Sequence, residues 1–67
     1  MFNEFKARRA ARRLVEAFPE ITEATARDRA RRLLGQYPAL MAADVADSLI
    51  RGERTARCVE RLRETWA

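Results

Sequence analysis

The side chains best suited to chemistry in this chain are arginines close to its start. Four of them recur at the spacing of one broad helix face, and they are Arg8, Arg9, Arg12 and Arg13. Guanidinium groups are permanently charged, planar donors that bind phosphate oxygens in pairs. The net charge of +4 also favours anionic partners. We expect this face either to bind an anion, nucleic acid first, or to be a solvated surface whose arginine stems cover apolar residues.

Groups that could perform catalysis are few. The chain has no His, one Ser (Ser48), one Cys (Cys58) and no Gly-rich loop that could cradle a phosphate. Most carboxylates have an arginine three or four residues away, which is typical of surface ion pairs and not of tuned acids. We expect Cys58 to be a buried structural thiol. The sequence therefore predicts no enzyme activity, no small-molecule substrate, no cofactor and no metal site.

The composition favours one all-helical domain over residues 1–67. Ala and Arg, both strong helix formers, dominate, whereas β-branched residues are few. A chain of 67 residues buries a thin core, and its lone cysteine excludes an internal disulfide. Helix packing or a second copy of the chain must then supply stability. No apolar run suits a signal peptide or a membrane span, so we expect a cytoplasmic protein without a membrane partner.

Two prolines and a glycine predict where the helices end. A proline disfavours helical geometry in the residue before it, and a glycine suits the position just beyond a helix end. Breaks at Pro19, Pro38 and Gly52 predict a compact bundle of four short helices. The expected helices are Asn3–Phe18, Thr22 to Gly35 or Tyr37, Ala39–Arg51 and Glu53–Trp66.

Apolar residues recur at helical spacing and predict which side of each helix is buried. The pattern of the first two helices is identical, as part of an internal repeat displaced by 19 residues. In both copies a helix is followed by an aromatic-proline corner, Phe18-Pro19 and Tyr37-Pro38. The last helix is also expected to point its apolar side chains inward, and these are Ala56, Val59, Leu62 and Trp66.

Part of the second half resembles the helix-turn-helix of bacterial transcriptional regulators. The resemblance is carried by Asp44-Val45-Ala46, Leu49, Gly52, Thr55-Ala56, Val59 and Leu62, after a lead-in similar to that of some small antitoxins, Tyr37-Pro38-Ala39-Leu40. In that motif a small Ala lets two helices cross closely, a turn follows, and a Thr begins the recognition helix. The resemblance implies that four residues face DNA, namely Arg54, Thr55, Arg57 and Arg61. Ordinary helix packing, with Ala46 at a close crossing, fits the same pattern.

Phe2 and Phe5 point away from the apolar side of the first helix. They are expected either to fold back over the bundle or to form an exposed patch that docks a partner or a second copy. Two functions are consistent with these features. The first is a small nucleic-acid-binding regulator, such as a repressor, an antitoxin or a phage-type accessory protein. The second is an adaptor or inhibitor that docks on an acidic protein through the arginine face with Phe2 and Phe5.

Overall fold

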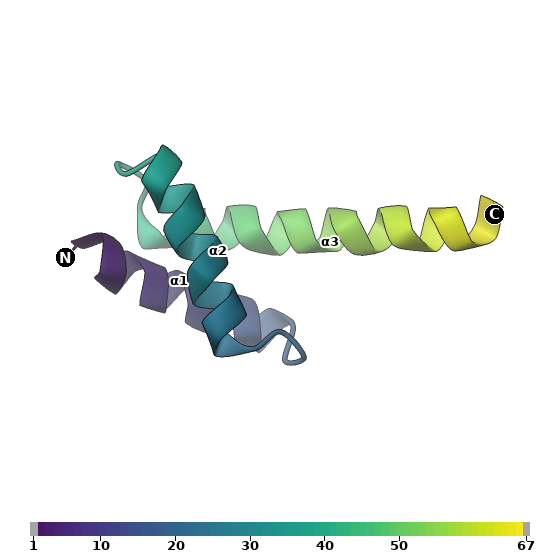
Figure 1. Ribbon diagram of the computed structural model, residues 1–67, viewed down its shortest axis with the longest axis horizontal. Coiled ribbons are helices and arrows are strands. Elements are labelled where there is room, and N and C mark those ends of the chain that lie inside the picture. The colour runs from purple at the N-terminus through teal and green to yellow at the C-terminus, as the bar shows by residue number, and fades with distance from the viewer. Residues whose placement is uncertain (1, 67) are drawn as a thin grey trace.

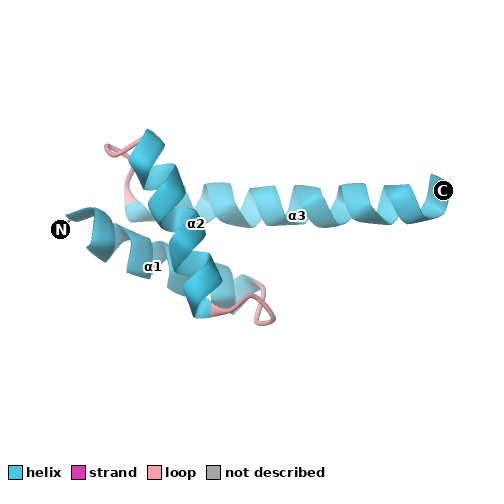
Figure 2. Cartoon of the chain, viewed as in Figure 1, coloured by secondary structure: helices cyan, strands magenta, loops and turns pink. Residues whose placement is uncertain are grey.

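A computed structural model describes residues 2–66, apart from the side chain of Phe2, as three helices joined by short loops (Figure 2). Helix α1 spans Phe2–Ala17, α2 spans Glu23–Gln36 and α3 spans Ala42–Trp66. Helix α2 crosses α1, and α3 begins beside them and then projects away with its C-terminal half (Figure 1). This projection makes the chain elongated, with extents of 45 × 22 × 15 Å.

The prediction of four helices is wrong, because residues 42–66 form the single helix α3. Gly52 lies inside this helix, and no described glycine has a positive φ. An interior glycine is less favourable than alanine by only about 1 kcal/mol. That penalty does not end a helix whose neighbouring residues are good helix formers. A glycine alone was therefore a weak stop signal.

A missing proline explains why α3 continues. Pro19 and Pro38 follow the ends of α1 and α2, where a proline disfavours helical geometry in the preceding residue. One repeat after Pro38 the chain has Arg57 in place of a proline. Arg is a good helix former with a backbone N–H, so the helix does not end at this position. The helix-and-corner unit is therefore not completed a third time.

The two aromatic-proline corners share the same backbone hydrogen bonds. Helices α1 and α2 end 19 residues apart, at Ala17 and Gln36. The paired bonds run from the amides of Phe18 to Leu14 O (2.9 Å) and Tyr37 to Leu33 O (2.9 Å), then from Ile21 to Phe18 O (2.9 Å) and Leu40 to Tyr37 O (3.1 Å). The internal repeat thus corresponds to one structural unit, a helix followed by a tight corner.

The core lies where the three helices cross, and alanine dominates it. Ala7, Ala26 and Val45 occupy equivalent places one repeat apart, and each is fully buried. The largest fully buried side chains are only Leu14, Leu34 and Val45. Small side chains let the helix backbones approach closely, but they remove little apolar surface from water.

The apolar residues near the end of α3 do not join this core, so their predicted inward placement is wrong. Val59, Leu62 and Trp66 are 42%, 53% and 84% exposed, and Ala56 and Cys58 are exposed as well. The prediction assumed a separate fourth helix that could turn its apolar side toward the others. In one continuous helix these residues lie in the half that projects beyond α1 and α2, where no other described helix can cover them (Figure 1). The prediction of a buried thiol fails for the same reason.

None of the described helices is both long and apolar enough to cross a lipid bilayer.

Candidate nucleic-acid interface

The residues that α1 buries determine which of its residues face outward. Ala7, Ala10, Ala11 and Leu14 are fully buried against the other helices. The residues between them, which include the arginines of the predicted face, therefore point outward. The arginines stand on a helix whose orientation is fixed by packing.

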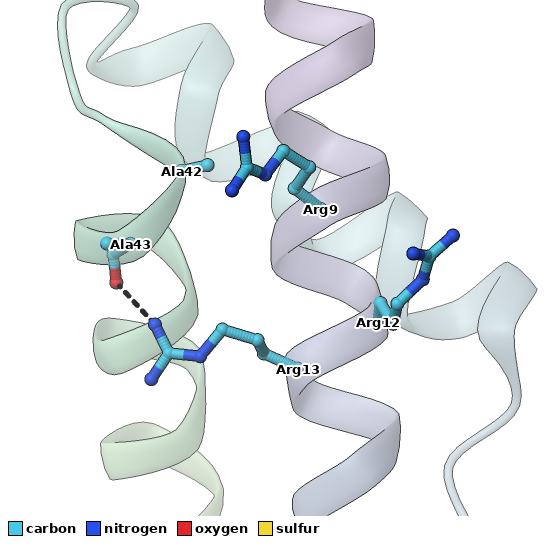
Figure 3. A pocket seen from close by; sticks show the side chains of 5 residues that line it. All are labelled: Arg9, Arg12, Arg13, Ala42 and Ala43. Carbon is cyan, nitrogen blue, oxygen red and sulfur yellow. Dashed lines mark hydrogen bonds between the residues drawn. The ribbon is translucent and has the colours of Figure 1, made fainter.

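A hollow separates this face from the start of α3 (Figure 3). Arg9, Arg12 and Arg13 line it from α1, and Ala42 and Ala43 line it from α3. The Arg9 side chain extends toward Ala42, whereas the Arg12 side chain points away from α3. The two alanines leave room beside the guanidinium groups.

Arg13 is already engaged by the protein itself. Its guanidinium contacts Asp47 Oδ1 at 2.8 Å and donates to the Ala43 carbonyl oxygen at 3.5 Å. This contact joins α1 to α3, and both side chains stay about half exposed. Arg13 can therefore add charge to a site, but a ligand would compete with Asp47 for its donors.

The other three arginines of the predicted face have no such partner. Among residues 2–66, no carboxylate lies within ion-pair distance of Arg8, Arg9 or Arg12. The guanidinium of Arg9 lies over the Phe5 ring, 5.6 Å from its centroid. A second hollow, lined by these three arginines and Phe5, adjoins the first. An anion could bind here without displacing an existing ion pair.

Helix α3 continues the positive charge along the same side of the molecule. A third hollow at the α1–α3 seam is lined by Arg13, Asp47, Ile50, Arg51 and Arg54. Arg61 follows Arg54 by seven residues, two helical turns, and so lies on the same side of α3. We call the combined surface the α1–α3 strip, which consists of Arg8, Arg9, Arg12, Arg13, Arg51, Arg54 and Arg61.

Most of the excess charge of the chain lies on this strip. Six of the fourteen basic side chains pair with six of the ten acidic ones within the described part of the chain. The basic side chains outside these pairs are Lys6, Arg8, Arg9, Arg12, Arg51, Arg54, Arg61 and Arg63. Six of them belong to the strip. Lys6 donates instead to the carbonyl oxygen of Pro38 at 3.0 Å.

Arg57, predicted to face DNA, is instead a packing residue. Its guanidinium lies over the Phe18 ring, 4.3 Å from the centroid, and pairs with Glu20 and, at 2.9 Å, with Glu53. Hydrogen bonds from Arg57 and Arg29 hold the pKa of Glu53 below its ordinary value. These contacts tie α3 to the first corner, so an external anion would have to compete with Glu20 and Glu53 for Arg57.

The remaining predicted residues are dispersed. Arg54 and Arg61 lie on the strip, but Thr55 faces a different side of α3, since adjacent helical residues point in different directions. Phe5 is 55% exposed beside Arg9. The side chain of Phe2 lies outside the described residues. Arg51 was missed because it was assigned to a helix end; its spacing of three from Arg54 was the available signal.

The structure lacks the turn that the helix-turn-helix resemblance required. Residues 44–62, which carried the resemblance, all lie within α3, and Gly52 is helical. A recognition helix therefore does not begin at Thr55. Any contact that α3 makes with DNA must be made by the outer side of a continuous helix.

In comparisons with protein-family models, curated proteins and solved structures, nothing matches this chain. Within residues 2–66 no three His, Cys, Asp or Glu side chains come together as a metal site.

Proposed function

We propose that this chain is a non-enzymatic nucleic-acid-binding module that holds the phosphate backbone of a duplex against the α1–α3 strip. The observation that carries the proposal is the unpaired state of Arg8, Arg9 and Arg12 on a helix fixed by its buried face. Unpaired guanidinium groups can release the counterions of phosphates without first breaking a protein ion pair. Arg51, Arg54 and Arg61 extend the strip along α3.

The strip suits binding to the backbone more than reading of sequence. It contains no Asn or Gln, the side chains that pair with adenine edges, and α3 presents a mixed surface in place of a recognition helix. Contacts to phosphates position a protein on a duplex but carry no sequence information directly. We therefore expect similar affinity for duplexes of different sequence.

The test is a fluorescence-anisotropy titration of labelled mixed-sequence duplex DNA across a series of salt concentrations. Six unpaired arginines that each neutralise one phosphate predict a slope of about −5 in a plot of log K against log salt. The double variant Arg9→Ala/Arg12→Ala should make that slope shallower by about 2. Absence of binding at low salt would rule the proposal out.

A matched control is available on α2. Arg27 and Arg32 each pair only within their own helix, with Glu23 at 4.0 Å and Asp28 at 3.2 Å. The variant Arg27→Ala/Arg32→Ala removes the same charge from a surface outside the strip. Its salt slope should match that of the wild type. If the slope becomes shallower by the same amount in the α1 and α2 variants, net charge alone drives binding.

The exposed Phe5 supports a second function, docking on an acidic protein. Its ring lies among the unpaired arginines of the second hollow, and aromatic and arginine side chains together are typical of binding hot spots. Such binding would keep much of its affinity at high salt and would be lost in Phe5→Ala. Phosphate binding, in contrast, should change less than about twofold in Phe5→Ala, since a ring releases no counterions.

A further inference from the structure

The projecting half of α3 carries an apolar stripe that the other described residues do not cover. Thr55, Val59, Leu62 and Trp66 follow one another at intervals of four, three and four residues, so they form one line along the helix. We call this line the C-terminal stripe. Trp66 at its end is 84% exposed, although it is the largest apolar side chain of the protein.

The packing of residues 2–66 leaves this stripe uncovered. Counted at 3.6 residues per turn, the stripe lies on a different side of α3 from Val45, Ala46 and Leu49, which face the core. Beyond Arg57, no hydrogen bond or ion pair found among residues 2–66 leaves α3. The stripe therefore lies on the length of α3 that projects beyond α1 and α2 (Figure 1).

The chain exposes more surface than a compact monomer of its mass, and the excess is close to what one partner buries in an interface. The accessible surface is 5144 Å², whereas a compact monomer of 7.8 kDa exposes about 4,400 Å². The excess of about 750 Å² is close to the roughly 800 Å² that each partner buries in a standard protein interface. A protein partner with an interface of standard size would therefore bring the exposed area close to that of a compact monomer.

We propose that the occupant is a second copy of this chain, with the two projecting helices packed antiparallel. A two-fold axis between Glu60 and Arg61 sets Val59 of one copy opposite Leu62 of the other. It also sets Thr55 opposite Trp66. The stripe of one copy thus matches the stripe of the other. A surface that binds an unrelated partner does not need this self-complementarity.

The borders of the stripe fit this antiparallel packing. Ala56, Cys58 and Thr65, which flank the line, are small and uncharged, so two helices can approach closely. The charged border residue Arg63 lies nearest to Ala56 of the other copy, and Glu60 and Glu64 lie on the opposite side of the helix. The pairing therefore sets no two like charges face to face, although each chain carries +4.

The absence of a side chain at Gly52 is compatible with this packing. A side chain at Gly52 would meet nothing within 4 Å in the single chain, so close packing there does not require a glycine. In the antiparallel pair, the indole of Trp66 from the second copy lies beside Thr55 and above Gly52. The absent side chain leaves room for that ring.

Sedimentation equilibrium of the whole chain tests this proposal between about 5 and 500 μM, the range of a modest protein interface. The mass should rise from 7.8 kDa to twice that value with increasing concentration. Over the same range Trp66, the only tryptophan, should shift its emission to shorter wavelengths as its ring leaves water. A monomer at every concentration overturns the proposal.

Variants of α3 test whether the C-terminal stripe forms the dimer interface. Leu62→Glu should abolish the dimer, and Trp66→Ala should weaken it about tenfold or more. Glu64→Ala, on the opposite side of the same helix, should leave the dissociation constant within about twofold of the wild type. Because these side chains lie outside the core, circular dichroism should show folded protein in all three. A dimer that survives Leu62→Glu uses another surface and also overturns the proposal.

This inference does not rest on the proposed function. The strip arginines Arg9 and Arg12 lie on α1, away from the stripe, so Arg9→Ala/Arg12→Ala should leave the dimer intact. Leu62→Glu, in turn, should make the chain monomeric but leave its binding to a short duplex intact. Loss of dimerisation without loss of duplex binding, or the reverse, therefore shows which proposal has failed.

Discussion

The two halves of α3 belong to one helix, but different forces hold them. The first half, residues 42–53, includes Val45 and Ala46, which are fully buried against α1 and α2. The second half, residues 54–66, is exposed throughout except for Arg57, which is partly buried. Tertiary packing stabilises the first half, whereas the second follows it through intrinsic helix propensity and the absence of a stop signal. A helix can therefore extend beyond the core that nucleates it and display a surface there.

The same negative charge placed in each half of α3 should change the stability of the fold by very different amounts. Val45→Asp buries an unpaired carboxylate and should lower the free energy of unfolding by several kcal/mol, enough to unfold the domain. Leu62→Asp adds the carboxylate to an exposed position and should change the monomer by less than about 0.5 kcal/mol. Urea denaturation at low micromolar concentration measures both variants. Similar losses in the two would mean that the second half is packed after all.

The sequence allowed two of the three helices to be placed closely. Pro19 and Pro38 each remove a helical conformation from the residue before them, so the predicted ends differ from the observed ones, Ala17 and Gln36, by about one residue. The outward direction of Arg8, Arg9 and Arg12 also followed from the apolar residues between them. Such features depend on local geometry alone.

The length of α3 and the role of Arg57 could not be predicted, because they depend on residues distant from these positions or on small energy differences. Gly52 can end a helix or lie within one, and the difference of about 1 kcal/mol is decided by the helix propensity of the residues after it. That choice also fixed which side of the chain Val59 and Trp66 face. The role of Arg57 needs Phe18 and Glu20, which lie in a corner far back in the chain.

Arg57→Pro should give α3 the stop signal that ends α1 and α2. A proline inside a helix is unfavourable by about 3 kcal/mol, because it removes a backbone hydrogen bond and clashes with the preceding turn. We expect α3 to end before residue 57 and the following residues to lose their helical structure. The far-ultraviolet circular dichroism signal should fall accordingly while α1 and α2 remain folded.

The control for this variant is Arg57→Ala, which removes the guanidinium group but leaves a strong helix former at this position. It should retain the full helical signal and lose only the contacts to Glu20, Glu53 and Phe18. If the proline variant has the same helix content as the alanine variant, the absence of a proline is not what lets α3 continue.

Gly52→Ala should strengthen the junction between the two halves. The new methyl group meets no atom within 4 Å in the single chain, and Gly52 has no positive φ that would resist it. We expect a gain of about 0.5–1 kcal/mol in the free energy of unfolding, because alanine loses less backbone entropy in a helix. Thermal unfolding of dilute protein measures it. Gly35→Ala, near the end of α2 and equally open, is the matched comparison.

Acidification should produce the smallest effect, and it should act at the base of the projecting half. Hydrogen bonds from Arg57 and Arg29 lower the pKa of Glu53 below its ordinary value of 4.5, and the pKa of Glu20 is lowered by its own backbone amide and by Arg57. A carboxylate whose pKa is lower in the folded state stabilises that state above its unfolded pKa. This stability should be complete above pH 4.5 and decline as the pH falls through the lowered values.

Urea denaturation from pH 7 down to pH 3, the range that spans the ordinary pKa of Glu, should show this decline, and Arg57→Ala should reduce it. Arg61→Ala removes an equal charge one turn further along α3, where no described carboxylate pairs with it, and should leave the dependence unchanged. The two variants thus compare an arginine that connects α3 to the core with one that faces solvent. If both alter the pH dependence equally, then the general positive field, and not the contacts of Arg57 with Glu53 and Glu20, sets the behaviour of these carboxylates.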